Sequence, residues 1–465
     1  MNSRHLFPLA LLLTIVIYAC SPVEEKITTA QNAPLTVSND TVIFDTVFSS
    51  VGSITKRLRV FNTNDNAINL SRLFLGKGSD SEYSIHVNGE ENDSFEDLVI
   101  LGKDSLLVLV EVEVDPRDEN MPFIVKDSVV IEWNGNRDHV KLVSWGQDAI
   151  FINDEVIDCN TTWTADRPYV IYKAALVDTL CTLDVDPGTK IFIDNNASLF
   201  VKGSLRLNGT LENKVIIRNT RLDATFDISP GQWDGIYFLE GSFDNSIKHA
   251  VISNGTFGLR VGTPDDDSNF DLEIGNTTIE HMSVAGILAF TSDIRAYNTV
   301  VYNCGTYVVG NFLGGNYSYE HCTFANDPTS FFRDEPSFQF SDNIVLEDNS
   351  LLEEDLSLTI INSILWGNEN EEFLLSTSGN TNINLDIHDN LIRTRQQDLE
   401  TLDNIVSSSA EPPGFYDRFA FDYQIDSLGL ARDKGESIGI SHDILGTERD
   451  ATPDYGAYEK KDSIN

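Results

Sequence analysis

Acidic side chains cluster at several places in this sequence, and the densest group is a run of three aspartates, Asp265, Asp266 and Asp267. Carboxylate oxygens are the ligands that calcium prefers. A calcium ion held beside an arginine or lysine would support abstraction of a carbon-bound proton. Arg260 and Arg295 lie in neighbouring repeats, but neither pairs obviously with the run. We therefore expect a solvated acidic loop, with a calcium-dependent catalytic site as the alternative.

The remaining acidic groups follow no common spacing. They are Glu353-Glu354-Asp355, Glu369, Glu371 and Glu372. Measured from the repeat described below, they fall at different offsets, so they need not share a face with the aspartate run. Two cooperating carboxylates must face one substrate, and these offsets do not predict such a pair. We assign no catalytic residue from the sequence.

Three aromatic residues are candidates for sugar binding. Tyr302 and Trp366 each follow a large apolar residue of the repeat, and Trp233 lies near its start. Side chains alternate along a strand, so the position after an inward residue points outward. An exposed indole leaves apolar area in water, and aromatic rings suit the apolar faces of sugars. Coverage of Tyr302 and Trp366 by loops is the interpretation we favour, and a carbohydrate-binding face formed by these three residues is the functional alternative.

The element that must position these residues is a repeat between Ile252 and Leu391, in which a polar residue is followed three positions later by a large apolar one. The pairs are His249 and Ile252, Asn276 and Ile279, Asn298 and Val301, His321 and Phe324, Asp342 and Val345, Asn362 and Leu365, and His388 and Leu391. A period of 20 to 50 residues is typical of a solenoid, and β-branched residues with Asn and Gly predict strands and tight turns. The pattern predicts one coil of a parallel β-helix per repeat, with the large residues inside.

The polar members of the repeat should lie at turns, where stacked Asn and His side chains hydrogen-bond from coil to coil. Four histidines, His249, His281, His321 and His388, fall in or beside this ladder. A metal site is the alternative. No three of these histidines have the spacing of zinc ligands, so we expect hydrogen bonding.

The N-terminus has the features of an export signal. Residues 1–19 hold an apolar run too short to span a bilayer, which takes about 20 residues. The run ends in Ile17-Tyr18-Ala19-Cys20, which resembles the lipobox of bacterial lipoproteins, although Ile17 and Tyr18 depart from it. The resemblance implies cleavage before Cys20, lipidation of Cys20, and a flexible tether over residues 20–37. The acidic Glu24 and Glu25 resemble a surface-export signal.

Residues 38–148 change to short alternating strands, such as Leu106-Leu-Val-Leu-Val-Glu-Val-Glu-Val114, separated by turn clusters. That pattern predicts a β-sandwich of immunoglobulin type, and it resembles the spacer domains related to the ASPM/SPD-2/hydin family. We expect residues 149–398 to form the β-helix, and within them Leu183 to Leu391 resembles the pectin-lyase-like superfamily of right-handed parallel β-helices, whose bacterial members include surface proteins. The fold class is therefore all-β: a right-handed parallel β-helix preceded by an immunoglobulin-like β-sandwich.

Residues 399–465 resemble the closing segment of bacterial β-helix proteins, and a solenoid needs a cap for its exposed strand edges. We therefore interpret Asp454 and Glu459 as closure residues. Cys159 and Cys181 flank the entry to the β-helix, and an exported protein permits a disulfide between them. Cys304 and Cys322 do not share a register position, so we expect two buried thiols.

A net charge of −41 argues against nucleic acid, which requires basic patches. The resembling superfamily contains polysaccharide lyases and hydrolases, but the Asn-Thr-Asp, Gly-His-Gly and Arg-Ile-Lys signatures of polygalacturonases are absent. We expect an outer-membrane lipoprotein exposed at the cell surface that binds an extracellular polysaccharide without cleaving it and needs no cofactor. The alternatives are a calcium-dependent lyase acting on uronate polymers and an adhesin that contacts protein or other cells.

Overall fold

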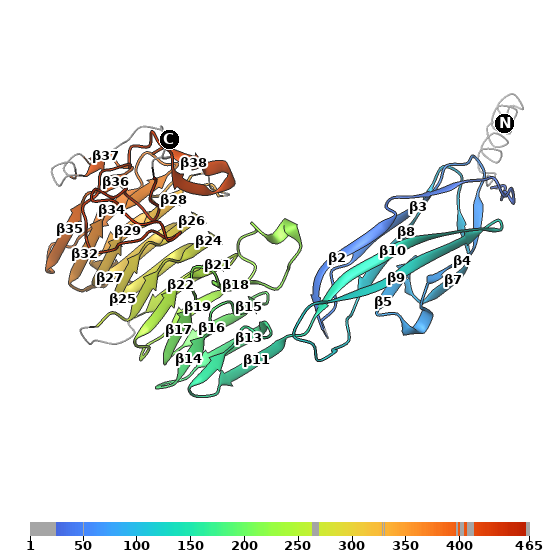
Figure 1. The fold of residues 1–465 in the computed structure, drawn as a ribbon, viewed down its shortest axis with the longest axis horizontal. Helices are drawn as coiled ribbons and strands as arrows, with labels where there is room; N and C mark the ends of the chain where they lie inside the picture. Colours follow the sequence, from blue (N-terminus) through green and yellow to red (C-terminus); the bar gives the residue numbers. More distant parts are fainter. Residues whose placement is uncertain are drawn as a thin grey trace, which may run out of the picture. The chain divides into compact units, whose positions relative to one another are not determined.

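A computed structural model describes residues 25–49, 51–262, 269–327, 329, 331–396, 399, 404–406 and 413–461. Cys20 and the aspartate run, Asp265 to Asp267, lie outside these residues. The chain divides between Asp148 and Ala149 into two compact units, which are separately visible in Figure 1. Within the described residues, no helix is long and apolar enough to cross a membrane.

The first unit is a β-sandwich of two five-stranded sheets. The flexible tether predicted for residues 20–37 is wrong for its described part, because Leu35–Val37 forms a strand of this sandwich and Trp133 donates its indole N–H to the Ala33 carbonyl. One sheet has the order β1 (Leu35–Val37), β3 (Lys56–Asn62), β8 (Ser105–Val112), β5 (Tyr83–Val87), β6 (Glu90–Glu91). The other has the order β2 (Thr41–Phe48), β10 (Asn136–Gln147), β9 (Phe123–Trp133), β4 (Ile68–Leu75), β7 (Ser94–Ile100), and a 3-10 turn, η1, spans Gly78–Asp80. Alternate residues of the strands fill the space between the sheets, as Leu106, Val108 and Val110 of β8 illustrate.

The second unit is a parallel β-helix whose strand pairings separate into three sheets, here called I, II and III in chain order within a coil. Sheet I contains the first parts of β11 (Ile150–Ile157) and β13 (Tyr169–Val177), then β15 (Lys190–Ile193), β18 (Val215–Asn219), β21 (Ala250–Ser253), β24 (Thr278–Met282), β26 (Val300–Cys304), β28 (Thr323–Asn326), β33 (Ile364–Gly367), β36 (Leu391–Ile392) and β37 (Ile405–Val406). Sheet II contains the second parts of β11 and β13, then β16 (Ser198–Val201), β19 (Gly235–Phe238), β22 (Phe257–Gly262), the first parts of β25 (Ala285–Tyr297) and β27 (Tyr307–Glu320), β29 (Phe338–Ser341) and β34 (Phe373–Ser376). Sheet III contains β12 (Thr161–Trp163), β14 (Thr182–Val185), β17 (Ser204–Asn208), β20 (Asn245–Lys248), β23 (Leu272–Gly275), the last parts of β25 and β27, β32 (Leu356–Ile361) and β35 (Ile383–His388).

Smaller elements project from this β-helix. They are a hairpin of β30 (Asn343–Val345) and β31 (Leu351–Glu353), a hairpin of β38 (Phe415–Asp417) and β39 (Asp422–Ile425), and the 3-10 turns η2 (Ala224–Phe226) and η4 (Arg418–Ala420).

The repeat in the sequence follows sheet I. Its large residues form one inward row in the order Ile217, Ile252, Ile279, Val301, Phe324, Leu365 and Ile392. Two members of the predicted row are wrong. Val345 belongs to the inserted β30–β31 hairpin, and Leu391 pairs with Ile364, one position away from the inward row. The insertion happens to be almost one repeat long, which is why it imitated a coil.

The polar members of the repeat form the turn between sheets III and I. His249, Asn276, Asn298, His321 and Asn362 all have a left-handed backbone, with φ between 45° and 52°. In the last coil Asp389 takes this conformation in place of the predicted His388, and the predicted Asp342 does not adopt it. Asn and Asp are among the few non-glycine residues that tolerate this conformation, so the turn itself selects them. Asn298 donates to Asn276 at 3.0 Å, and Asn362 bonds the His321 ring at 3.0 Å. The predicted ladder of hydrogen bonds between coils is thus present.

Residues 413–461, here called the C-terminal segment, lie against the outer face of sheet I and its turn ladder. Tyr423, Ile444 and Ala457 pack on Val300 and Tyr302, and a second cluster joins Ile425, Ala431 and Tyr455 to Ile364 and Trp366. Asn362 fixes the segment by accepting from the main-chain N–H of Glu436 at 3.1 Å and donating to its carbonyl at 2.8 Å. The approach requires Gly435, because a Cβ there would lie 2.7 Å from Asn362 Oδ1.

Buried charges fasten this segment internally. Glu459 accepts from the main-chain N–H groups of Asp450 and Asp454 and pairs with Arg449 at 3.4 Å. Asp454 in turn accepts from the N–H groups of Asp433 and Lys460. Both carboxylates therefore hold together turns of the C-terminal segment. The segment covers the outer face of sheet I, and closure of the strand edges at the end of the β-helix stays a prediction.

The cysteines divide as their positions indicate. Cys159 and Cys181 form a disulfide across 22 residues at the start of the β-helix. Cys304 and Cys322 are buried free thiols, and burial raises the pKa of each to about 12. Neither free thiol is therefore ionised or reactive at neutral pH.

Candidate functional site

The aromatic residues singled out from the sequence do not form an exposed platform. Tyr302 and Trp366 do share one outward row of sheet I, with Ala325 between them. The C-terminal segment covers that row, and Trp366 has no exposed surface. Trp233 points into the β-helix and donates its indole N–H to the Ser253 carbonyl. The outward direction of Tyr302 and Trp366 and their coverage were predicted correctly, since the segment buries their apolar area. Their candidacy as an exposed carbohydrate-binding face is therefore wrong.

The acidic groups within the described residues do not gather into a catalytic site. Glu372 is buried in an ion pair with Arg333 at 2.7 Å and accepts from Ser337. Glu371 accepts from the main-chain N–H of Arg395. Glu353 accepts from the amide of Asn380. These bonds give Glu353, Glu371 and Glu372 structural roles within the protein.

The two arginines considered as bases have different surroundings. Arg295 is bound to Glu320 at 2.8 Å on the outer face of sheet III. Hydrogen bonding to Glu320 raises its pKa further, so Arg295 stays protonated and is not a base. Arg260 is exposed on sheet II. It lies on β22, which ends at Gly262, just before the part of the chain that carries Asp265 to Asp267.

Sheet II carries the aromatic surface that the sequence reading missed. One outward row runs through Leu176, Phe200, Tyr237 and Arg260 on four successive coils. Phe257, at the start of β22, adds a second ring beside Tyr237. The rings of Phe200 and Tyr237 are 5.3 Å apart, and those of Tyr237 and Phe257 are 6.1 Å apart. We call Phe200, Tyr237, Phe257 and Arg260 the sheet II stripe.

Polar groups are interleaved with the rings of the stripe. The Arg260 guanidinium lies 5.5 Å from the ring centres of both Tyr237 and Phe257. Burial, followed by a hydrogen bond to Asp234, raises the pKa of Tyr237 to about 12. Asp234 also accepts from the Ser198 hydroxyl at 2.8 Å. Tyr237 therefore remains a neutral phenol, and Arg260 contributes the positive charge of the stripe.

The surroundings of the stripe are partly open. All three rings are half-buried and Arg260 is exposed. A hollow of about 300 Å³ adjoins Phe200 and is also lined by Leu176, Lys202 and Asp154. Gly235 is needed here, since a Cβ would lie 3.1 Å from both Phe257 and Tyr237.

Further along sheet II, a second aromatic group lies beside the row of the stripe, which itself continues from Arg260 to Leu288 and Gly310. Phe290 pairs in register with Phe312, with ring centres 5.9 Å apart, and Tyr307 packs edge-on against Phe312. These three side chains are half-buried. Half-exposed rings therefore lie on five coils of one sheet, in a surface that runs along the axis of the β-helix.

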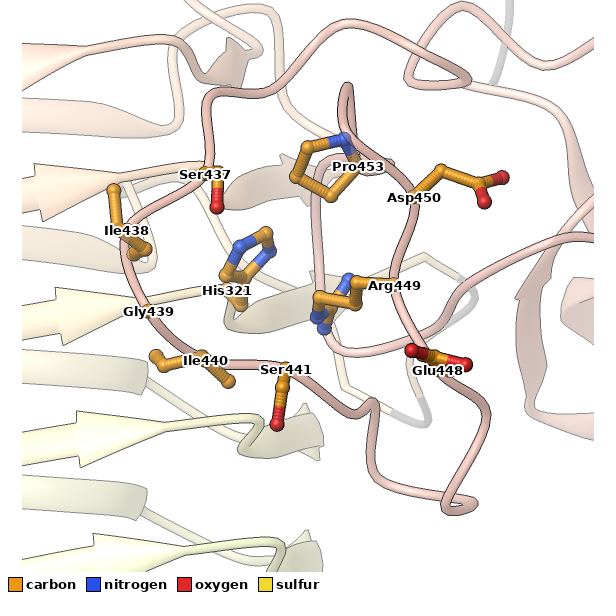
Figure 2. A pocket seen from close by; sticks show the side chains of 10 residues that line it. All are labelled: His321, Ser437, Ile438, Gly439, Ile440, Ser441, Glu448, Arg449, Asp450 and Pro453. Atoms are coloured by element: carbon orange, nitrogen blue, oxygen red, sulfur yellow. The ribbon is translucent and has the colours of Figure 1, made fainter.

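A smaller, polar pocket lies between the turns that join sheets III and I and the C-terminal segment. Its volume is about 150 Å³, and its lining includes His321, Ser437, Ser441, Arg449 and Pro453. Figure 2 shows the Ser437 hydroxyl and the Arg449 head directed toward the His321 ring. Burial lowers the pKa of His321 to about 3, so its imidazole is neutral at pH 7.

The other two histidines of the ladder, His281 and His388, have different surroundings. His281 is buried against Phe421 and Tyr302, and burial lowers its pKa to about 4. Among the described residues, a close group of ligand atoms from His388, Asp389 and Glu436 lies within 4.8 Å. Hydrogen bonding to Asp389 at 2.9 Å accounts for the position of His388 without a metal.

Comparison with known proteins assigns no family. No family model matches the chain, and no curated protein matches it. Among solved structures, a protein of unknown function from Porphyromonas gingivalis is 13% identical, with a TM-score of 0.19, over 27% of this chain and 60% of that one. The PapD-like domain 7 of human CEP192 is 12% identical, with a TM-score of 0.18, over 28% and 94%. The catalytic domain of a family 87 α-1,3-glucanase in complex with tetrasaccharides is 9% identical, with a TM-score of 0.24, over 81% and 88%.

Proposed function

We propose that this chain is a cell-surface lipoprotein whose β-helix binds an extracellular polysaccharide, without cleaving it, through the sheet II stripe. The observation that supports this proposal most strongly is the set of half-exposed rings on successive coils, interleaved with Arg260 and Asp234. Aromatic faces accept the apolar C–H faces of sugar rings, and a few fixed polar groups select their orientation. The carboxylates of Glu371 and Glu372 are already satisfied within the protein, which favours binding over catalysis.

The direction of the stripe suggests the shape of the ligand. Neighbouring strands in a sheet are about 4.8 Å apart, so successive rings follow the axis at short, regular steps. A linear chain lying along the axis would contact several rings at once. Binding should therefore strengthen with the length of the oligosaccharide until the stripe is filled.

Attachment to the outer membrane through a lipidated Cys20 remains part of the proposal. The supporting observation is the apolar run ending at Cys20. Labelling of growing cells with a tagged fatty acid tests it. The wild-type protein should carry the label and a Cys20→Ala variant should not, and an unlabelled wild type would remove the anchor.

The binding experiment uses purified protein and a panel of neutral and acidic oligosaccharides in titration calorimetry. Tyr237→Ala and Phe257→Ala should each weaken binding by about tenfold or more, since one packed ring contributes on the order of 1.5 kcal/mol. Phe419→Ala is the matched control, because Phe419 is 72% exposed and lies in the C-terminal segment. Equal affinities for the wild type and both stripe variants would contradict the proposal.

One observation favours a second candidate, the calcium-dependent lyase. Arg260 lies on β22, five positions before Asp265, the first residue of the aspartate run. Uronate polymers with and without calcium, followed by ultraviolet absorbance of unsaturated ends, test this candidate. A calcium-dependent rise that is lost in Asp265→Ala/Asp267→Ala would establish cleavage. If neither cleavage nor glycan binding occurs, adhesion to protein or cells is the remaining alternative.

A further inference from the structure

The turn ladder and the C-terminal segment enclose a second opening, separate from the sheet II stripe. Residues 437–441 cross the ladder and line two adjoining pockets. The pocket beside His321 measures about 150 Å³, and the pocket beside His249 measures about 370 Å³. Gly439, Ile440 and Ser441 border both. We call the two pockets together the ladder groove, and Figure 2 shows the pocket beside His321.

The hydrogen bonds of the ladder determine which His321 nitrogen carries the proton. The Asn362 amide is oriented by Glu436, whose N–H donates to Oδ1 while its carbonyl accepts from Nδ2. Nδ2 therefore also faces His321 Nε2, at 3.0 Å, and must donate to it. Since the imidazole is neutral, its own proton is on Nδ1.

That Nδ1–H donor has no hydrogen-bond partner although His321 is only 1% exposed. The main-chain carbonyls of Gly456 and Asp454 lie near enough to affect the pKa of His321, but neither reaches Nδ1 in hydrogen-bond geometry. The Nε–H of Arg449, in the lining of the same pocket, is also without a partner. Buried donors left without acceptors cost about 1–3 kcal/mol each, so the pocket is suited to an oxygen acceptor.

His249 repeats the arrangement in the second pocket. Asn298 donates to Asn276 Oδ1, so Asn276 Nδ2 faces His249 Nε2, at 3.5 Å. Nε2 is again the acceptor, and the Nδ1 donor again has no partner. Burial, followed by the charge of Lys214, lowers the pKa of His249. Two neutral imidazoles thus present N–H donors to adjoining pockets from one ladder.

The charges nearby decide what kind of acceptor fits. Glu459, Asp443 and Asp454 all lie close enough to Arg449 to influence its pKa. Three carboxylates around one guanidinium oppose a further anion, whereas a neutral hydroxyl or ether oxygen avoids that repulsion. Ile440, Pro453 and the serine hydroxyls add apolar and hydrogen-bonding surface to the lining.

We propose that the ladder groove binds a neutral, hydroxyl-bearing sugar unit, whose oxygens accept from His321 Nδ1, His249 Nδ1 and Arg449 Nε. Liquid water takes about 30 Å³ per molecule, so the smaller pocket has room for about five water molecules and the larger pocket for about twelve. This site is independent of the sheet II stripe and stands whether or not the stripe binds a polymer.

Nuclear magnetic resonance of purified protein labelled with ¹⁵N-histidine tests the proposal. His321→Asn and His249→Asn assign the two signals, because Asn already occupies left-handed ladder positions such as Asn298. Glucose, galactose and mannose are titrated separately to about 10 mM, ten times a Kd of 1 mM, and sodium acetate is the anionic probe. We expect both free rings to show protonated Nδ1, and at least one neutral sugar to shift an Nδ1–H signal while acetate does not.

A blocking variant separates specific binding from a general solvent effect. Ser441→Trp places a large side chain between the two pockets and should abolish the shift. Ser427→Trp is the matched control, at an exposed site in the same segment, and should keep it. The proposal would be overturned by a signal shift with acetate but with no sugar, or by a sugar-induced shift that persists in Ser441→Trp. It would also be overturned if no sugar shifts a signal, which would indicate a groove that holds water only.

Discussion

Asn362 joins the turn ladder to the C-terminal segment, and its substitution should have a large effect on the free energy of unfolding. Its side chain is fully buried and makes three hydrogen bonds, to the His321 ring and to both main-chain groups of Glu436. At about 1 kcal/mol per bond, their loss in Asn362→Gly should lower the free energy of unfolding by about 3 kcal/mol. Asn362→Ala should cost about 1 kcal/mol more, because its φ of 52° disfavours a Cβ.

Asn349→Ala is the matched control for this experiment. Asn349 also has a left-handed backbone, with a φ of 63°, but it is exposed in the β30–β31 hairpin and makes no side-chain clamp. It should cost only the backbone strain, about 1 kcal/mol. A similar loss in Asn349→Ala and Asn362→Ala would refute the clamp.

The assay combines urea denaturation with limited proteolysis. Solenoids can unfold in parts, so a global transition alone could miss local release of the C-terminal segment. In Asn362→Ala, cleavage within residues 413–461 should become faster than cleavage in the β-helix strands. Unchanged proteolysis together with unchanged urea stability would show that apolar packing on Tyr302 and Trp366 is sufficient to hold the segment.

Three further outcomes follow from buried groups. Cys159→Ser/Cys181→Ser should lose about 3 kcal/mol of unfolding free energy by the chain-entropy relation for a loop of 22 residues; reduction without loss of stability would contradict it. Arg333→Leu should cost about 3–5 kcal/mol by leaving Glu372 buried and unpaired, and Arg333→Leu/Glu372→Leu should regain most of it in the same urea assay. The pKa of His321 is about 3 in the folded protein and 6.5 in the exposed state. When the pH is lowered below 6.5, the unfolded chain therefore takes up the proton before the folded protein does, and the free energy of unfolding decreases. The stability difference between wild type and His321→Asn should therefore decrease by up to about 1.4 kcal/mol per pH unit between pH 6.5 and 3; a constant difference would contradict a buried neutral ring.

Much of the fold could be predicted because each coil of the β-helix imposes the same requirements on the same positions. The turn between sheets III and I demands a left-handed residue once per coil, and the inward position of sheet I demands a large apolar one. Asn276 with Ile279 and Asn298 with Val301 therefore carry the coil period directly. The period failed at Asp342 and Val345, because a hairpin insertion of similar length is not distinguished from a coil by spacing alone.

The candidate site was less predictable, because coverage is a long-range property. Alternation indicated that Tyr302 and Trp366 face outward, but nothing local showed that residues 60 to 150 positions later would lie on them. The sheet II stripe had no comparable signal. Phe200, Tyr237 and Arg260 are separated by unequal loops, so their shared row appears only once the coils are in register.

The central claim, that the sheet II stripe binds a polysaccharide, is tested most directly by calorimetry with oligosaccharides of increasing length. The account predicts affinity that rises with chain length in the wild type, and that falls about tenfold or more in Tyr237→Ala while Phe419→Ala binds like the wild type. Binding that is independent of length and unchanged by Tyr237→Ala, or no binding across the panel, would contradict it.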